Sequence, residues 1–340
     1  MAVNSCHYFY VTGEVLMATR SIFALLISFA VCAALCPVGI PILHRMKFGQ
    51  EVRDDGPQSH LKKQGTPTMG GIMILIGVAA GALPFAGSDP ETLPVLLFTL
   101  AFGLIGFLDD FLKIRRKQSE GLTVKQKLLL QIAATAVLAG YLWQKEDLRG
   151  MLVPFSGDLE SGVIVPLGVL YIPFVFFVVI GTDNGTNFTD GLDGLCSSVT
   201  IAVAVFFLAF SVREGISCGP ASGAVAGALL GFLLFNCYPA KVFMGDTGAL
   251  ALGGYVASTA LLLKMPLFIL LAGFIYLAEV VSVMIQVVYF KKTHGKRFFR
   301  MAPIHHHFEL GGWSETRVVT VFTAVTVILS LLCWLGIGAA

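Results

Sequence analysis

The chain has 340 residues, of which 56% are hydrophobic and only 13% are charged, against the ~25% charged residues of an average soluble domain. Together with a mean hydropathy of +0.81, this composition excludes an ordinary soluble protein and indicates an integral membrane protein. The net charge of only +2 argues against a nucleic-acid partner. The seven cysteines are odd in number and widely scattered, so we expect neither a disulfide framework nor a zinc site from them.

A membrane-spanning helix needs roughly 17 to 25 mostly apolar residues, and apolar runs of about this length recur along the chain. The first run exceeds the ~7 to 15 apolar residues of a cleaved signal peptide, and no small-residue cleavage site follows it. We therefore predict an all-α integral membrane protein with ten transmembrane helices, divided into an N-terminal extension at 1–20 and a single polytopic membrane domain at 21–340. The predicted spans cover residues 21–43, 70–87, 93–112, 128–143, 163–181, 195–212, 221–239, 248–263, 265–290 and 318–340.

Lysine and arginine gather in every second connection between the predicted spans. Connections that stay in the cytoplasm carry the excess of positive charge. We therefore predict that the connections after the odd-numbered spans are cytoplasmic and that both termini lie outside. Of the 23 lysines and arginines, all fall in these connections except Arg20, Lys145, Arg149, Arg213 and Lys264.

Five polar segments fall at the cytoplasmic ends of the predicted spans. The connections on the opposite side are short or unremarkable, with residues 144–162 as the long exception. Random polar loops would be shared between the two sides, so we expect an active site on the cytoplasmic face. The five segments are KKQGTPTMGG at 62–71, FLDDFLK at 107–113, NFTDGLDGL at 187–195, NCYPAKVFMGDTGAL at 236–250 and APIHHHFELGGW at 302–313.

Two adjacent acids, Asp109 and Asp110, stand near the end of the third predicted span. Lys113 follows Asp109 by four residues, the spacing at which helical side chains meet, so one reading is a simple salt bridge that ends the span. Two carboxylates exceed what one lysine neutralises, and unpaired acids at a membrane edge are costly. We therefore favour Mg²⁺ or phosphate chemistry at this pair.

The segment NFTDGLDGL places Asp190 and Asp193 on one helical face if the sixth span begins near Asp190. One of the two suits an N-cap of that helix. Capping does not account for both acids together with Asn187. Gly191 and Gly194 remove side-chain bulk beside the acids and permit the close approach of a ligand.

The segment FMGDTG sets Asp246 between two glycines just ahead of an apolar helix. A tight turn with an N-cap aspartate is the local alternative. Free backbone N–H groups at a helix start also bind phosphate, and a carboxylate there can hold a hard cation. Mg²⁺ is commonly held by one or two carboxylates and substrate phosphates. The convergence of the five segments thus favours a magnesium site at Asp246, with Asp109 and Asp110 as further candidate ligands.

Three consecutive histidines, His305, His306 and His307, follow the ninth predicted span. Consecutive side chains project in different directions, unlike the i, i+4 histidine pair of a zinc helix, so we do not expect zinc. Imidazoles titrate near neutral pH and suit an anionic ligand beside basic residues. A merely hydrophilic loop is the other reading, but Phe308 and Trp313 make this loop amphipathic.

Five motifs together resemble the bacterial phospho-N-acetylmuramoyl-pentapeptide-transferase family, within the polyprenyl-phosphate N-acetylhexosamine-1-phosphate transferase superfamily. These motifs are GTPTMGG, FLDDFLK, NFTDGLDGL, NCYPAKVFMGDTGALALGG and APIHHHFELGGW. The resemblance implies Mg²⁺-dependent transfer of phospho-N-acetylmuramoyl-pentapeptide from its UDP conjugate to undecaprenyl phosphate, which forms lipid I and releases UMP. It also implies a ten-span fold and a homodimer in the lipid bilayer of the bacterial inner membrane, with the active site facing the cytoplasm.

The resemblance assigns site residues position by position. Asp109, Asp110 and Asp246 resemble the family's catalytic acids, with Asp246 as the Mg²⁺ ligand. Asp183, Gly185 and Phe188 depart from the smaller or aliphatic residues of many members, and residues 1–17 have no counterpart in the family pattern. The positions that resemble substrate-binding groups are Lys63, Thr68, Lys113, Lys125, Asn187, Asp190, Asp193, Asn236, Phe243 and Gly245 of the uracil pocket, Gln286, His305, His306 and His307.

Three alternative functions must be weighed against the same residues. A secondary transporter would carry acids near the bilayer midplane on interrupted helices, whereas only Gln131 and Glu279 lie well inside the predicted spans. A CDP-alcohol phosphotransferase also uses Asp-Gly motifs with Mg²⁺, but TDGLDGL lacks the Ala-Arg that follows that family's first Asp-Gly. Within the superfamily, a hexosamine transferase for other glycans is the runner-up, and PIHHHFELGGW argues against it.

Overall fold

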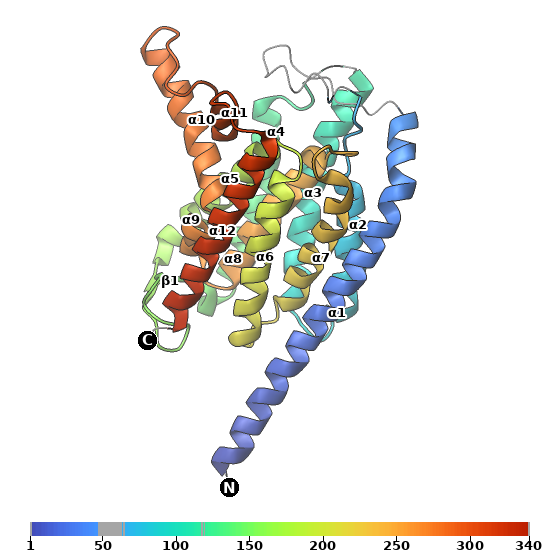
Figure 1. The fold of residues 1–340 in the computed structure, drawn as a ribbon. Coiled ribbons are helices and arrows are strands. Elements are labelled where there is room, and N and C mark those ends of the chain that lie inside the picture. The colour runs from blue at the N-terminus through green and yellow to red at the C-terminus, as the bar shows by residue number, and fades with distance from the viewer. Residues whose placement is uncertain (1, 47–62, 64, 117, 119, 339–340) are drawn as a thin grey trace.

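The computed structural model describes residues 2–46, 63, 65–116, 118 and 120–338, with residues 2–12 and 338 described by their backbone alone (Figure 1). The start of the first helix and the end of the last one lie toward the same end of a helix bundle (Figure 1). The helices of the described part are α1 (Ala2–Arg45), α2 (Gly71–Ala82), α3 (Thr92–Arg116), α4 (Val124–Trp143), α5 (Tyr171–Thr189), α6 (Leu195–Arg213), α7 (Gly219–Asn236), α8 (Gly245–Leu262), α9 (Ile269–Ala272), α10 (Phe274–Lys292), α11 (Ile304–Glu309) and α12 (Glu315–Gly338). Strands β1 (Gly150–Leu152) and β2 (Ile164–Pro166) pair antiparallel, with Gly150 opposite Pro166.

Seven helices in the described residues are long and apolar enough to cross a membrane, which confirms the predicted all-α membrane class. Each of the ten predicted spans overlaps a helix, but α2, α4 and α8 are outside these seven. The number of crossings and the side on which the termini lie therefore stay predictions. The predicted division at residue 20 also stays a prediction, and α1 continues through this residue without a break.

Two helix boundaries differ from those expected. The fifth helix is longer than the predicted span at 163–181, because α5 continues to Thr189. Helix α6 begins at Leu195, as predicted, so Asp190 and Asp193 lie in the connection and do not share a helical face. The polar end of α5 can be buried because its hydroxyls are satisfied within the helix: that of Thr189 donates to the Gly185 carbonyl, one turn earlier, at 2.7 Å. The predicted span at 265–290 is divided, since α9 ends at Ala272 and α10 begins at Phe274.

Small residues let the helix backbones pack directly on one another. A Cβ atom at Gly223 would collide with the carbonyl oxygen of Ser21 on α1, and one at Gly227 would collide with that of Leu25. Two glycines four residues apart on α7 thus face two consecutive turns of α1. Such small-residue interfaces drive helix association where no hydrophobic effect acts between helices.

Helix α8 is the buried centre of the bundle, with every residue from Thr247 to Leu262 buried. It packs against α3 on one side and α5 on another. Asp246 occupies its first turn. In contrast, α10 diverges from the bundle at the far end from the chain termini, with α11 beside it (Figure 1).

Candidate functional site

Three carboxylates from two helices meet at the start of α8. Asp109 and Asp110 lie on α3, each only 3% exposed, and Asp246 lies on α8. Each acid contributes one oxygen to a set in which all oxygens lie within 4.8 Å of one another. The two helices come this close because Gly106 has no side chain, and a Cβ atom there would collide with the carbonyl oxygen of Asp246. The predicted grouping of these acids is therefore present in the structure.

Asp110 caps the start of α8 from the neighbouring helix. One of its oxygens accepts from the Thr247 backbone N–H at 2.9 Å and from the Thr247 hydroxyl at 2.7 Å, and the other accepts from the Asp246 N–H at 3.2 Å. These N–H groups have no partner within their own helix. Gly245 just before them has φ +68°, and a Cβ atom there would lie 2.6 Å from Asp110 Oδ2 and 2.7 Å from Thr68 Oγ1. The predicted residues Gly245 and Thr68 thus border the acids.

Lys113 lies among all three acids. Its Nζ is 2.6 Å from Asp109 Oδ2, 2.9 Å from Asp246 Oδ2 and 3.8 Å from Asp110 Oδ1. The expected i, i+4 pair with Asp109 is confirmed, but a simple salt bridge does not describe a lysine with three carboxylates. A single ammonium group leaves this cluster with excess negative charge.

A second lysine of the cluster, Lys127, is one that the sequence reading missed. Its Nζ lies 3.1 Å from Asp246 Oδ2 and 3.2 Å from Asn187 Oδ1, and Asn187 Nδ2 donates to Asp246 Oδ1 at 2.8 Å. Lys125, the predicted substrate contact, is exposed two residues away. The helix start was readable in the sequence, since Thr123 and Gln126 form a capping box that begins α4 before Lys127.

The connection before α6 is tied to two distant segments by a second ionic group. Lys63 Nζ lies 2.6 Å from Asp193 Oδ1 and 2.5 Å from Glu315 Oε1, and Glu315 also accepts from the Asp193 N–H at 2.6 Å. Burial would lower the pKa of Lys63, but its hydrogen bonds to Asp193 and Glu315 outweigh this and raise the pKa. Lys63 and Asp193 were predicted site residues, whereas Glu315 was not.

Asp190 lies in the same connection, close to the acids of the first cluster. Its burial and the nearby carboxylates of Asp246, Asp110 and Asp193 raise its pKa well above the usual aspartate value. This carboxyl therefore feels the negative charge of the whole site, which a bound cation would relieve.

The segment 236–244 is held in place by backbone and amide contacts. Both amide atoms of Asn236 are used internally: Oδ1 accepts from the Ser197 hydroxyl at 3.0 Å and Nδ2 donates to the Val242 carbonyl at 2.9 Å. Phe243 donates its N–H to the Pro67 carbonyl at 2.9 Å. Its ring lies with its centroid 6.0 Å from Lys63 Nζ. Asn236 thus positions the loop that carries Phe243, and the uracil pocket itself stays a prediction.

The three histidines point to different partners, as expected. His305 is 1% exposed, with Nδ1 3.0 Å from Glu279 Oε1 on α10. His306 Nδ1 lies 2.8 Å from Glu309 Oε2, and His307 Nδ1 accepts from the Arg300 N–H at 3.1 Å.

The His305 ring fills the space beside Gly191, where a Cβ atom would collide with it. This predicted ligand contact is therefore buried behind the connection that carries Asp190. On α10, Gln286 accepts from the N–H groups of Phe298 and Phe299 at 3.1 and 2.9 Å. The described contacts of Gln286 fix a loop, and its role in ligand binding stays a prediction.

Comparison with known proteins identifies relatives over nearly the full length of the chain. Residues 92–264 match the family model described as glycosyl transferase family 4, and residues 63–75 match signature 1 of phospho-N-acetylmuramoyl-pentapeptide-transferase. The phospho-N-acetylmuramoyl-pentapeptide-transferase of Acetivibrio thermocellus is 51% identical over 320 residues, which cover 94% of each chain.

The chain belongs to the phospho-N-acetylmuramoyl-pentapeptide-transferase family. Two further relatives with the same name, from Clostridium botulinum (strain Alaska E43) and Clostridioides difficile (strain 630), support this assignment. The first is 50% identical over 317 residues, covering 92% of this chain and 95% of the relative. The second is 46% identical over 324 residues, covering 94% and 98%. The resemblance seen in the sequence and the assignment as a transferase are thereby confirmed.

The acids of this family member fit a hard divalent cation. Mg²⁺ takes oxygen ligands at about 2.0–2.1 Å and keeps several waters, so one or two carboxylates suffice to hold it. Asp110 already accepts three hydrogen bonds that cap α8. Asp246 also accepts three hydrogen bonds, but from the side chains of Lys113, Lys127 and Asn187, which can turn away. Two of the three donors to Asp110 are backbone N–H groups of α8. Asp246 and Asp109 could therefore take a cation with the smaller loss of hydrogen bonds.

Proposed function

We propose that this transferase of peptidoglycan synthesis moves phospho-N-acetylmuramoyl-pentapeptide from its UDP conjugate to undecaprenyl phosphate in a Mg²⁺-dependent reaction, forming lipid I and releasing UMP. The observation that carries the proposal is the meeting of Asp109, Asp110 and Asp246 with two lysines, Lys113 and Lys127, at the ends of apolar helices. Phosphoryl transfer needs a site that gathers anionic groups and neutralises charge as it spreads over the transferred phosphoryl.

Each side chain of the cluster has a defined part in this proposal. When bound, Mg²⁺ supplies the Lewis acid that neutralises the donor pyrophosphate. Asp246 and Asp109 would hold the cation, and Asn187 would keep Asp246 oriented through its hydrogen bond at 2.8 Å. Lys113, with a side chain 33% exposed, is free to turn from the acids toward a substrate phosphate. Lys127 offers a second positive charge on the other side of Asp246.

The acceptor needs little activation at this site. A phosphate monoester carries about −1.5 to −2 charge at pH 7 because its second pKa is ~6. Undecaprenyl phosphate is therefore already a largely ionised nucleophile, and we propose that it attacks the donor directly. Asp109 orients the acceptor rather than forming a phosphoryl-aspartate, although such an intermediate is chemically feasible.

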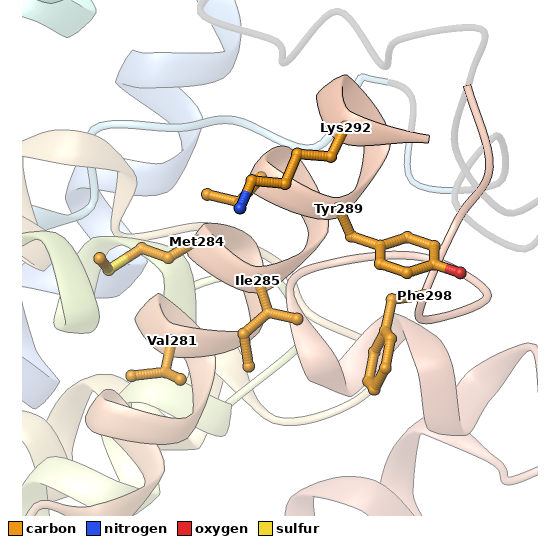
Figure 2. A pocket seen from close by; sticks show the side chains of 7 residues that line it. Val281, Met284, Ile285, Tyr289, Lys292 and Phe298 are labelled. Carbon is orange, nitrogen blue, oxygen red and sulfur yellow. The ribbon is translucent and has the colours of Figure 1, made fainter. Parts of the chain in front are cut away.

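An apolar surface on α10 suits the isoprenoid chain of the acceptor. One face of this helix lines an open apolar groove. Figure 2 shows the side chains that line the groove, with Lys292 at one end. The polar residues Glu279 and Gln286 lie seven residues apart, which is about two helical turns, so they share a different face of α10 from the apolar groove. We propose that the isoprenoid chain lies along the apolar face. The groove is lined by Val281, Met284, Ile285, Val288, Tyr289, Lys292 and Phe298.

The proposal includes the placement of the enzyme. The lysine and arginine distribution supports ten spans with both termini outside and a site that faces the cytoplasm, where the UDP-linked donor is found. We infer that the protein resides in the bacterial cytoplasmic membrane and, by resemblance to its family, forms a homodimer.

The test is donor choice in detergent solution. The purified protein is incubated with undecaprenyl phosphate, Mg²⁺ and radiolabelled UDP-N-acetylmuramoyl-pentapeptide, and in a parallel reaction with labelled UDP-N-acetylglucosamine. We expect lipid-extractable product and UMP from the first donor only. Product from the second donor alone would contradict the proposal and favour a hexosamine transferase for another glycan.

A further inference from the structure

One polar pair, an aspartate with a glutamine, is buried between α4 and α5. Asp183 on α5 is fully buried, and Gln131 on α4 is 1% exposed. Gln131 Nε2 donates to Asp183 Oδ2 at 2.6 Å. Among the described residues, the other oxygen of Asp183 is buried without a hydrogen-bond partner. A carboxyl group inside apolar helices is costly and therefore marks a functional position by default.

This pair lies one helical turn from two residues of the cluster. Gln131 follows Lys127 by four residues, and Asp183 precedes Asn187 by four, so each pair shares one face of its helix. Lys127 contacts Asn187 at 3.2 Å in the same way that Gln131 contacts Asp183. Two adjacent polar contacts thus join α4 to α5. The outer one, Lys127 with Asn187, also contacts Asp246.

Helix α8 packs on the same carboxyl group. A Cβ atom at Gly253 would lie 2.5 Å from Asp183 Oδ1 and 2.5 Å from Thr186 Oγ1, so the α8 backbone lies directly against Asp183. Gly253 follows Asp246 by seven residues, about two helical turns along the same face of α8. Asp183 therefore contacts both helices, α4 and α8, that carry the partners of Asn187.

We propose that Asp183 is a positioning residue, which through its hydrogen bond to Gln131 holds α4 and α5 at the separation where Lys127 and Asn187 both reach Asp246. The inference rests on the proposed role of Asp246 in catalysis. Its mechanical basis is the short distance between the inner and outer contacts: four residues of α-helix span about 6 Å, so a shift at Gln131 is carried to Lys127.

A purely structural role is the alternative that the test must separate. The pair would then only strengthen the association of α4 with α5, and its loss would lower thermal stability without a specific effect on the cluster. Two readouts distinguish the roles: dependence on Lys127, and the Mg²⁺ concentration at which the protein is stabilised against heat.

The turnover experiment compares Asp183→Ala, Asp183→Asn, Gln131→Met and Lys127→Met. We expect Asp183→Ala and Gln131→Met to lower kcat by about 10- to 100-fold, as losses around a metal site do. Asp183→Asn keeps an oxygen acceptor for Gln131 and should retain most of the activity. In the Lys127→Met background, Asp183→Ala should cost clearly less than it does in the wild-type background, because one of the two groups that it positions is gone.

The control is Thr135→Val on α4, since Thr135 is buried one turn beyond Gln131 and its hydroxyl bonds to the Gln131 carbonyl of its own helix. It should leave kcat unchanged. If Asp183→Ala fails to fold, Gln131→Met carries the same test. Wild-type kcat in both variants, or an equal loss with and without Lys127, would overturn the inference.

A second measurement needs no turnover. Unfolding temperature in detergent is followed as MgCl₂ is added alone. Asp183→Ala or Gln131→Met should need about 10-fold more Mg²⁺ for the same rise, because Asp246 loses the hydrogen bond from Asn187 that orients it. Thr135→Val should respond as the wild type does. A Mg²⁺ response without product formation would refute the proposed reaction while still testing the positioning role, and an unchanged Mg²⁺ response in both variants would overturn the latter.

Discussion

Asp110 on α3 accepts hydrogen bonds from both the backbone N–H and the hydroxyl of Thr247 on α8, at 2.9 and 2.7 Å. The cap of one helix thus comes from an acid on another helix. Its neighbour Asp109 instead pairs with Lys113 at 2.6 Å and accepts a hydrogen bond from the Leu122 N–H at 2.8 Å.

Asp110→Asn should destabilise the protein because it removes a hydrogen-bond acceptor as well as a charge. Both carboxylate oxygens face N–H donors, and an amide offers only one oxygen, so its NH₂ group would face a donor. An unsatisfied buried donor costs about 1–3 kcal/mol. The measurement is thermal unfolding in detergent, with Thr247→Val, which removes only the hydroxyl, as a milder comparison. Equal unfolding temperatures for wild type and Asp110→Asn would contradict the capping role.

Asp246→Asn should abolish turnover mainly through the metal. Replacing one anionic oxygen in a site with few protein ligands weakens a hard cation strongly. Turnover is measured across a Mg²⁺ titration, and we expect activity, where present, only at concentrations far above those that the wild type needs. Near wild-type activity at ordinary Mg²⁺ would show that the metal assignment is wrong.

Lys127→Met and Lys125→Met form a matched pair two residues apart on α4. Lys127 contacts Asp246 at 3.1 Å, whereas Lys125 is exposed. We expect Lys127→Met to lower kcat/KM by about 100-fold, since it removes a charge next to the reacting phosphates, and Lys125→Met to have little effect. The opposite result would support the family-based assignment of Lys125 and remove Lys127 from the site.

The Lys63 contacts with Asp193 and Glu315 should stabilise the protein over a wide pH range. The raised pKa of Lys63 means that the folded state binds its proton more tightly than the unfolded state does. This contribution is fully present below the unfolded lysine pKa of about 10.4 and is lost as the pH rises through the higher folded value. Lys63→Gln should lose about 1.5–3 kcal/mol at neutral pH, the worth of a hydrogen bond between charged groups. Its stability deficit should narrow only above about pH 10.

Glu315→Gln is the partner variant for this prediction. If Lys63 and Glu315 interact directly, the double variant loses less stability than the two single variants together. Additive losses at neutral pH would show that the contact at 2.5 Å contributes little in solution.

Direct attack by the acceptor predicts no partial reaction of the donor. A covalent enzyme would exchange radiolabelled UMP into the UDP-linked donor without any lipid phosphate, whereas a direct mechanism needs both substrates. The protein must first be stripped of co-purified lipid. Robust lipid-free exchange that disappears in Asp109→Asn would make Asp109 the nucleophile and refute direct attack.

The sequence by itself determined the membrane class and the grouping of motifs. Long apolar runs leave little choice, because every backbone polar group in lipid must be satisfied internally, and helices do this locally. The i, i+4 pair of Asp109 and Lys113 was readable for the same reason: it depends on one helix alone. The five motifs were sufficient to identify the family.

Only the tertiary structure decided which side chains meet across helices. Three contacts join residues far apart in the sequence: 119 residues separate Lys127 from Asp246, 252 separate Lys63 from Glu315, and 52 separate Gln131 from Asp183. No local sequence pattern predicts contacts over such separations. The extension of α5 to Thr189 was also missed, because its polar residues suggest a loop until their hydroxyls are seen to bond within the helix. Helix length is set by local hydrogen bonding, whereas contacts between helices depend on where glycines such as Gly106 and Gly253 let backbones approach.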